Sequence, residues 1–124
     1  MIGVGVDVVD VERFRAVLDR RPAMARRLFT DGELAYAQSA RDAMPRLAAR
    51  FAAKEAVMKA LGVGLGAFGW HEVEVIRDPS GAPRLCLTGR AEALAQGRGV
   101  GVWHISLSHS ALVAMAVAAA DVPG

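Results

Sequence analysis

The first residues of the chain alternate between apolar side chains and small or acidic ones, which is the period of a β-strand. Within residues 2–9 the apolar positions are Ile2, Val4, Val6 and Val8. The opposite face carries Gly3, Gly5 and Asp7. Because two glycines remove side chains from that face, another group could approach it closely beside the Asp7 carboxylate. An aspartate near a strand end can also simply cap or turn the chain, and the pattern leaves both possibilities open.

Helix signals follow this strand. Asp10 can cap a helix over residues 11–20, which Pro22 helps to end. Thr30 and Glu33 have the spacing of a capping box, in which each residue satisfies a backbone N–H of the other. We therefore predict that a second, short helix begins just after Thr30.

The longest helix signal covers residues 45–61 and ends at a glycine-rich stretch. At about 100° per residue, one arc of this helix is apolar. Its members are Leu47, Phe51, Val57, Met58 and Leu61. Lys54 projects into the middle of the arc, and Glu55 and Lys59 lie along its edge. Charges on a core-facing side are unfavourable unless they are paired or bound to something, so all three are candidate site residues.

Each of these charges also has a purely structural explanation. Glu55 and Lys59 are four residues apart, the spacing of a salt bridge on a helix surface. Lys54 could pack its stem on the core while its ammonium group reaches water. His109 lies between two serines at a predicted hairpin tip, where solvent exposure would explain it equally well.

Beyond Trp70 the pattern changes to β-structure. The predicted elements are strands over residues 72–77, 84–87, 102–107 and 112–119 and a helix over 89–96. Early and central helices beside a late antiparallel sheet predict an α+β fold. No linker divides the chain, so we expect one domain over residues 1–124.

Composition excludes several classes of protein. Apolar residues make up 53% of the chain and charged residues 23%, which is typical of a globular protein. The longest apolar run, 111–120, is too short to cross a bilayer, so no membrane association is expected. Cys86 is the only cysteine, which excludes an internal disulfide and favours the reducing cytoplasm.

Positive charge is concentrated near the N-terminus. Residues 12–27 contain six arginines and two acidic residues, a local charge of +4, whereas the whole chain carries +2. Such a patch suits an acidic protein, a nucleic acid or a phosphorylated ligand, although a solvated surface would look the same. The few aromatic residues are not interleaved with these arginines, which disfavours nucleic acid. His71 and His104 lack partners at metal-ligand spacing.

Taken in order, these segments resemble the holo-acyl-carrier-protein synthase family, the small phosphopantetheinyl transferases of fatty-acid synthesis. The segments are Gly3-Val4-Gly5-Val6-Asp7-Val8-Val9, Glu12-Arg13-Phe14, Arg27-Leu28-Phe29-Thr30, Arg50-Phe51-Ala52-Ala53-Lys54-Glu55-Ala56, Lys59-Ala60-Leu61-Gly62 and Ser106-Leu107-Ser108-His109. The resemblance runs from about residue 2 to 118 and implies the 4′-phosphopantetheinyl transferase fold, with helices packed on an antiparallel sheet.

The resemblance also implies roles for individual residues. Asp7 and Glu55 match the carboxylates that hold Mg²⁺, and Glu55 is also the implied base, either directly or through a metal-bound water. Lys59 matches a catalytic lysine at the phosphates of coenzyme A. The other positions near the coenzyme's phosphates are Arg50, Lys54 and His109. Arg13 and Arg20 match basic positions where an acidic acyl carrier protein docks.

The implied reaction moves 4′-phosphopantetheine from coenzyme A, the substrate, to a carrier-protein serine and releases 3′,5′-ADP. The family is typically a homotrimer with active sites at its subunit interfaces. Two alternatives remain open from the sequence. One is the same reaction on a polyketide or peptide-synthesis carrier protein, and the other is a non-catalytic trimeric scaffold that binds coenzyme A or carrier protein.

Overall fold

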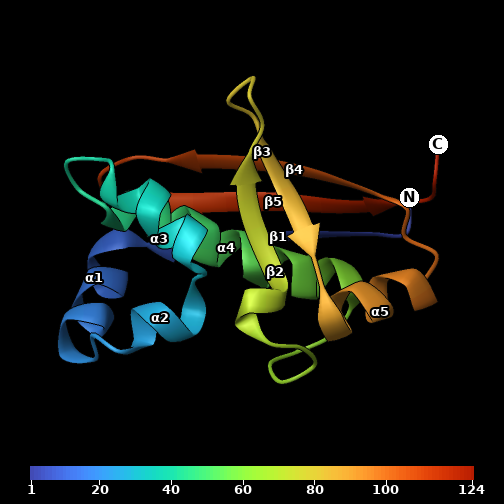
Figure 1. Ribbon diagram of the computed structural model, residues 1–124, viewed down its shortest axis with the longest axis horizontal. Helices are drawn as coiled ribbons and strands as arrows, with labels where there is room; N and C mark the ends of the chain where they lie inside the picture. Colours follow the sequence, from blue (N-terminus) through green and yellow to red (C-terminus); the bar gives the residue numbers. More distant parts are fainter.

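The fold is built around one long helix that crosses a small antiparallel sheet (Figure 1). The computed structural model describes all 124 residues. The elements in chain order are β1 (Gly3–Asp10), α1 (Val11–Arg20), α2 (Met24–Leu28), α3 (Asp31–Gln38), α4 (Met44–Leu61), the 3₁₀ helix η1 (Trp70–Glu72), β2 (Val73–Arg77), β3 (Pro83–Leu87), α5 (Gly89–Gly97), β4 (Val102–His109) and β5 (Val113–Asp121). The predicted α+β class is confirmed, and none of the helices is both long and apolar enough to span a membrane.

The main sheet has three antiparallel strands in the order β1-β5-β4, and β2 and β3 form a separate antiparallel hairpin. The first strand of the chain therefore pairs with the last, and both termini lie at the same end of the molecule (Figure 1). Asp7 is level with Ala116 of β5, which in turn is level with Leu107 of β4. This register places the Asp7 carboxylate on the edge strand, two strands away from β4.

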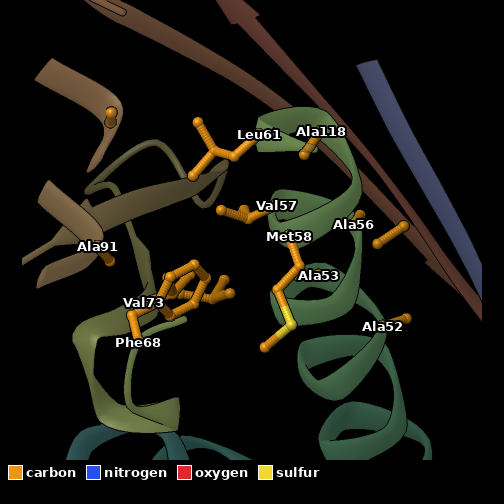
Figure 2. Packing of buried hydrophobic residues seen from close by; sticks show 13 residues of the cluster. Ala52, Ala53, Ala56, Val57, Met58, Leu61, Phe68, Val73, Ala91 and Ala118 are labelled. Carbon is orange, nitrogen blue, oxygen red and sulfur yellow. The ribbon is translucent and has the colours of Figure 1, made fainter. Parts of the chain in front are cut away.

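Small side chains allow α4 to lie close to this sheet. The side of α4 that faces the strands carries Ala52 and Ala56, and Ala118 of β5 faces the helix (Figure 2). Larger residues fill the opposite side, where Val57 and Leu61 point toward Phe68 and the β2–β3 hairpin (Figure 2). Two apolar layers thus meet on one helix, which explains why most of α4 is buried.

The closest approach is between α4 and the glycine face of β1. A Cβ atom added at Gly5 would overlap the carbonyl oxygen of Ala56, and one added at Gly3 would overlap that of Ala60. Because both obstacles are backbone atoms, no side-chain movement could relieve them. The close approach expected from the two glycines is confirmed.

The other face of β1 is uncovered. The valines at positions 4, 6 and 8 are exposed, and so are Val113, Met115 and Val117 on the neighbouring strand β5. The alternation in the sequence was therefore predicted correctly, but the helix packs on the glycine face and not on the apolar one. The result is a continuous exposed apolar surface on β1 and β5, which we call the outer sheet face.

The predicted elements agree with the structure to within two residues at each end, with two omissions, α2 and the 3₁₀ helix η1. Neither α2, with five residues, nor η1, with three, is long enough to show a helical period in the sequence. Thr30 and Glu33 form the predicted capping box at the start of α3. Asp10 caps α1 as expected, since its carboxylate accepts a hydrogen bond from the backbone N–H of Arg13.

We predict that Gly5→Ala lowers the free energy of unfolding by about 3 kcal/mol, because β1 must move away from α4 to admit the new methyl group. Gly97→Ala is the matched control, since a Cβ there meets nothing within 4 Å. Chemical denaturation of both variants measures the difference. Equal stabilities of the two variants would contradict the close contact.

Candidate active site

An open cleft of about 760 Å³ lies where β1, α1 and α4 meet. Asp7 enters it from the glycine face of β1, while Glu55 and Lys59 enter from successive turns of α4. Arg13 of α1 lines the same cleft. The structure therefore brings together Asp7, Glu55 and Lys59, which are far apart along the chain, and we call them the carboxylate–lysine site.

Lys59 bridges α4 and β1. Its Nζ lies 3.1 Å from Oδ1 of Asp7 and donates a second hydrogen bond, 3.0 Å long, to the carbonyl oxygen of Val6. The alternative pairing of Lys59 with Glu55 along the helix surface is absent. The ammonium group is thus held at the mouth of the cleft by strand atoms, with more than half of its side chain exposed.

Glu55 lies in an unfavourable environment for a negative charge. Partial burial raises the pKa of Glu55, and the nearby Asp7 charge raises it further, while Lys59 has the opposite effect. Two carboxylates that repel one another in a cleft are suited to share a cation. No third histidine, cysteine or acidic side chain joins them as a metal-ligand group. This donor set fits Mg²⁺, which takes one or two carboxylates and completes its shell with phosphate and water oxygens.

Lys54 has a different position from the one that the resemblance implied. Its side chain is completely buried, and its Nζ lies 2.9 Å from Oε1 of Glu33. It also donates hydrogen bonds to the carbonyl oxygens of Trp70 and Val73. Because burial lowers the pKa of Lys54, these acceptors are needed to keep it charged. Lys54 therefore ties α4 to α3 and β2, and neither a coenzyme contact nor a solvent-exposed ammonium group agrees with this position.

Arg50 and His109 lie together, but not with the carboxylate–lysine site. Both line a hollow of about 150 Å³ on the other side of α4. This follows from the helix itself, since Arg50 projects from a different side of α4 than Glu55 and Lys59 do. Arg50 is only 4% exposed, burial lowers its pKa, and its Nε has no hydrogen-bond acceptor.

Arg13 and Arg20 are exposed along α1, and neither forms an ion pair. Arg15, between them, is bound instead to Asp42, with its Nη2 2.6 Å from a carboxylate oxygen. That pair connects α1 to the loop before α4. The two unpaired arginines therefore remain available to a partner on the surface that borders the cleft.

A family model described as the 4′-phosphopantetheinyl transferase superfamily matches residues 3–116. The chain belongs to this superfamily. The match spans nearly the whole sequence, so the resemblance drawn from the sequence motifs is confirmed.

Relatives and solved structures agree with this assignment to the phosphopantetheinyl transferases. The holo-[acyl-carrier-protein] synthase of Streptomyces avermitilis is 51% identical over 98% of both chains. The structure of the same enzyme from Neisseria meningitidis has a TM-score of 0.88 at 30% identity and covers 98% of this chain and 99% of that one. The Helicobacter pylori synthase in complex with coenzyme A has a TM-score of 0.83 at 26% identity, with 95% and 99% covered.

The effects of Asp7 and Lys59 on the pKa of Glu55 can be tested by titration. We predict that Asp7→Asn lowers the pKa of Glu55, because it removes a repelling charge, and that Lys59→Met raises it, because it removes an attracting one. Carboxyl-carbon NMR of the metal-free protein measures both shifts. An unchanged Glu55 pKa in Asp7→Asn would show that the two carboxylates do not interact.

Proposed function

We propose that the protein transfers 4′-phosphopantetheine from coenzyme A to a serine of an apo acyl carrier protein, as the names of its relatives indicate for them. The observation that carries the proposal is the convergence of Asp7, Glu55 and Lys59 in one cleft. Two carboxylates with an adjacent ammonium group suit a reaction in which negative charge builds on phosphate oxygens.

Asp7 and Glu55 would hold the Mg²⁺ ion, which would neutralise charge on the diphosphate of the coenzyme when bound. Lys59 stands at the mouth of the same cleft, where its ammonium group can donate to a phosphate oxygen as well as to Asp7. In the free protein the pairing with Asp7 holds this side chain in place. The negative charge of a bound diphosphate would then attract the Lys59 ammonium group, which would not have to move far.

The carrier serine attacks the phosphorus that bears pantetheine, and the bond to the leaving 3′,5′-ADP oxygen breaks. Glu55, which lines the cleft, would accept the hydroxyl proton either directly or through a bound water. A base of this kind contributes about 10²–10⁴-fold to the rate. Lys59 stabilises the charge that develops on the departing diphosphate oxygen.

We further propose that the protein acts as a homotrimer with shared active sites. The outer sheet face supports assembly, because a continuous apolar surface on a small protein is unfavourable in water. The position of Arg50 and His109 supports sharing. They lie across α4 from the carboxylate–lysine site, so a coenzyme that reaches both would contact the cleft of one subunit and the hollow of the next.

For the carrier protein, α1 is the proposed docking element. Arg13 lines the catalytic cleft and Arg20 borders a second hollow, so an acidic helix laid along α1 could meet both. An apolar hollow between α1, α2 and α4 lies beside them, lined by Phe14, Val17 and Leu28 among others. We also propose a cytoplasmic location, which the unpaired, exposed Cys86 favours.

Mass spectrometry tests the reaction directly. We predict that apo carrier protein, incubated with this protein, coenzyme A and Mg²⁺, gains the mass of one phosphopantetheine. Asp7→Ala and Glu55→Ala should each lower kcat by about a hundredfold or more. Glu92→Ala, an exposed acid on α5, serves as the control. Coenzyme binding without any mass gain on fatty-acid, polyketide or peptide-synthesis carriers would favour the scaffold alternative.

Docking on α1 predicts a separate effect. Arg13→Glu combined with Arg20→Glu should raise the KM for the carrier about tenfold or more, since each exposed contact is weak and both are reversed. The KM for coenzyme A should stay nearly unchanged. Arg41→Glu with Arg98→Glu gives the same change in net charge on other surfaces. Carrier KM should also rise with salt, because the Debye length falls from about 10 Å at 0.1 M to about 3 Å at 1 M.

Shared sites predict complementation between two inactive variants. Asp7→Ala lacks a cleft carboxylate and His109→Ala lacks a side chain of the hollow. In mixed trimers some interfaces would combine an intact cleft with an intact hollow, so a co-refolded mixture should be more active than either variant alone. An activity equal to the average of the two would contradict the shared site.

A further inference from the structure

Three arginines surround the ring of Tyr36 on α3. The guanidinium carbons of Arg46 and Arg50 each lie 4.3 Å from the ring centroid, and that of Arg77 lies 4.9 Å away. Arg46 and Arg50 are one turn apart on α4, and Arg77 is the last residue of β2. A single aromatic ring thus gathers cations from two separate elements, at distances where the cations repel one another.

No carboxylate forms an ion pair with this cluster, although Glu33 attracts Arg50 at longer range. None of the three arginines forms an ion pair. Of the acidic side chains nearby, Glu33 is paired with Lys54, and Glu74, which borders a neighbouring hollow, accepts a hydrogen bond from Thr30. Concentrated positive charge without a counterion is unfavourable in the free protein and favourable once an anion binds.

The cluster is held in place by hydrogen bonds that leave one arginine unsatisfied. Arg77 donates to the hydroxyl of Tyr36, 2.9 Å away, and to the carbonyl oxygen of Gly81. Arg46 donates to the backbone carbonyl of Tyr36. Arg50 is nearly fully buried, yet its Nε has no acceptor. Buried N–H groups without a partner are uncommon and call for an explanation, and a bound anion supplies one.

The hollow beside the ring has the size and lining for a phosphate group. Tyr36, Arg50, Arg77 and His109 all border it. Guanidinium groups bind phosphate through paired N–H donors, and a nearby imidazole can add another. Coenzyme A carries two kinds of phosphate, a diphosphate and a ribose phosphomonoester. With the diphosphate at the carboxylate–lysine site, the monoester remains for this second site.

We propose that Tyr36 is a positioning residue that holds Arg50 and Arg77 together as one anion-binding site for the ribose phosphate of coenzyme A. The inference rests on the proposed use of coenzyme A. The ring keeps the guanidinium groups stacked and close together, and the hydroxyl orients Arg77. Without the ring, Arg50 and Arg77 would move apart and would no longer bind a phosphate group together.

Calorimetric binding of coenzyme A and of 3′-dephospho-coenzyme A to the full protein tests this role without requiring transfer. Tyr36→Leu should weaken coenzyme A binding about tenfold, through lost stacking of the arginines, and change dephospho-coenzyme A binding less than about twofold. Tyr36→Phe keeps the ring and should retain most of the preference for coenzyme A. Arg77→Ala, an exposed position, should resemble Tyr36→Leu, and Arg41→Ala should resemble the wild type.

Equal weakening of both ligands by Tyr36→Leu, or a wild type that binds both equally, would overturn the proposal. A fully retained preference for coenzyme A in both Tyr36→Leu and Arg77→Ala would also overturn it. The outcome is separable from that of the proposed function. A wild type that prefers coenzyme A but transfers nothing would contradict the transferase function and leave the role of Tyr36 supported.

Discussion

The contact between the glycine face of β1 and the backbone of α4 is the constraint on which the site depends. With side chains at Gly3 and Gly5, the strand could not lie against the carbonyl oxygens of the helix. That distance sets how far Asp7 stands from the helix residues Glu55 and Lys59. Two residues without side chains thus determine the spacing of three charged ones.

A second set of interactions holds the other side of α4. The Lys54–Glu33 pair joins the helix to α3, and the hydrogen bonds of Lys54 to Trp70 and Val73 join it to η1 and to the start of β2. Glu33 also accepts hydrogen bonds from the backbone of Thr30 and Val75. Breaking such a network leaves a buried charge unpaired, which is strongly destabilising. The same elements carry Tyr36 and Arg77, so this network also orders the arginine cluster.

Local patterns in the sequence were sufficient for most of the fold. Strand alternation, two caps and the long apolar arc predicted every element except α2 and the 3₁₀ helix η1, because these signals depend on neighbouring residues. The order of motifs identified the family, and with it Asp7, Glu55 and Lys59. Contacts between distant segments were not predictable in this way. The partner of Lys54 is Glu33, 21 positions earlier, which the sequence had already assigned to a capping box. The ring that gathers three arginines belongs to Tyr36, the only tyrosine of the chain, so no repeated pattern marked it. The two glycines predicted a close approach on one face of β1, but not that the approaching element is α4, more than 30 residues away.

The pairing of β1 with β5 also sets an order of events during synthesis. β1 leaves the ribosome well before β5, its only hydrogen-bonded neighbour in the sheet, has been made. Until residues 113–121 have been synthesised, the strand that carries Asp7 has no partner, and contacts this distant along the chain form slowly. The helices can form as they emerge, but the cleft cannot. A nascent chain therefore carries all of its site residues, in the correct order, well before it has a site.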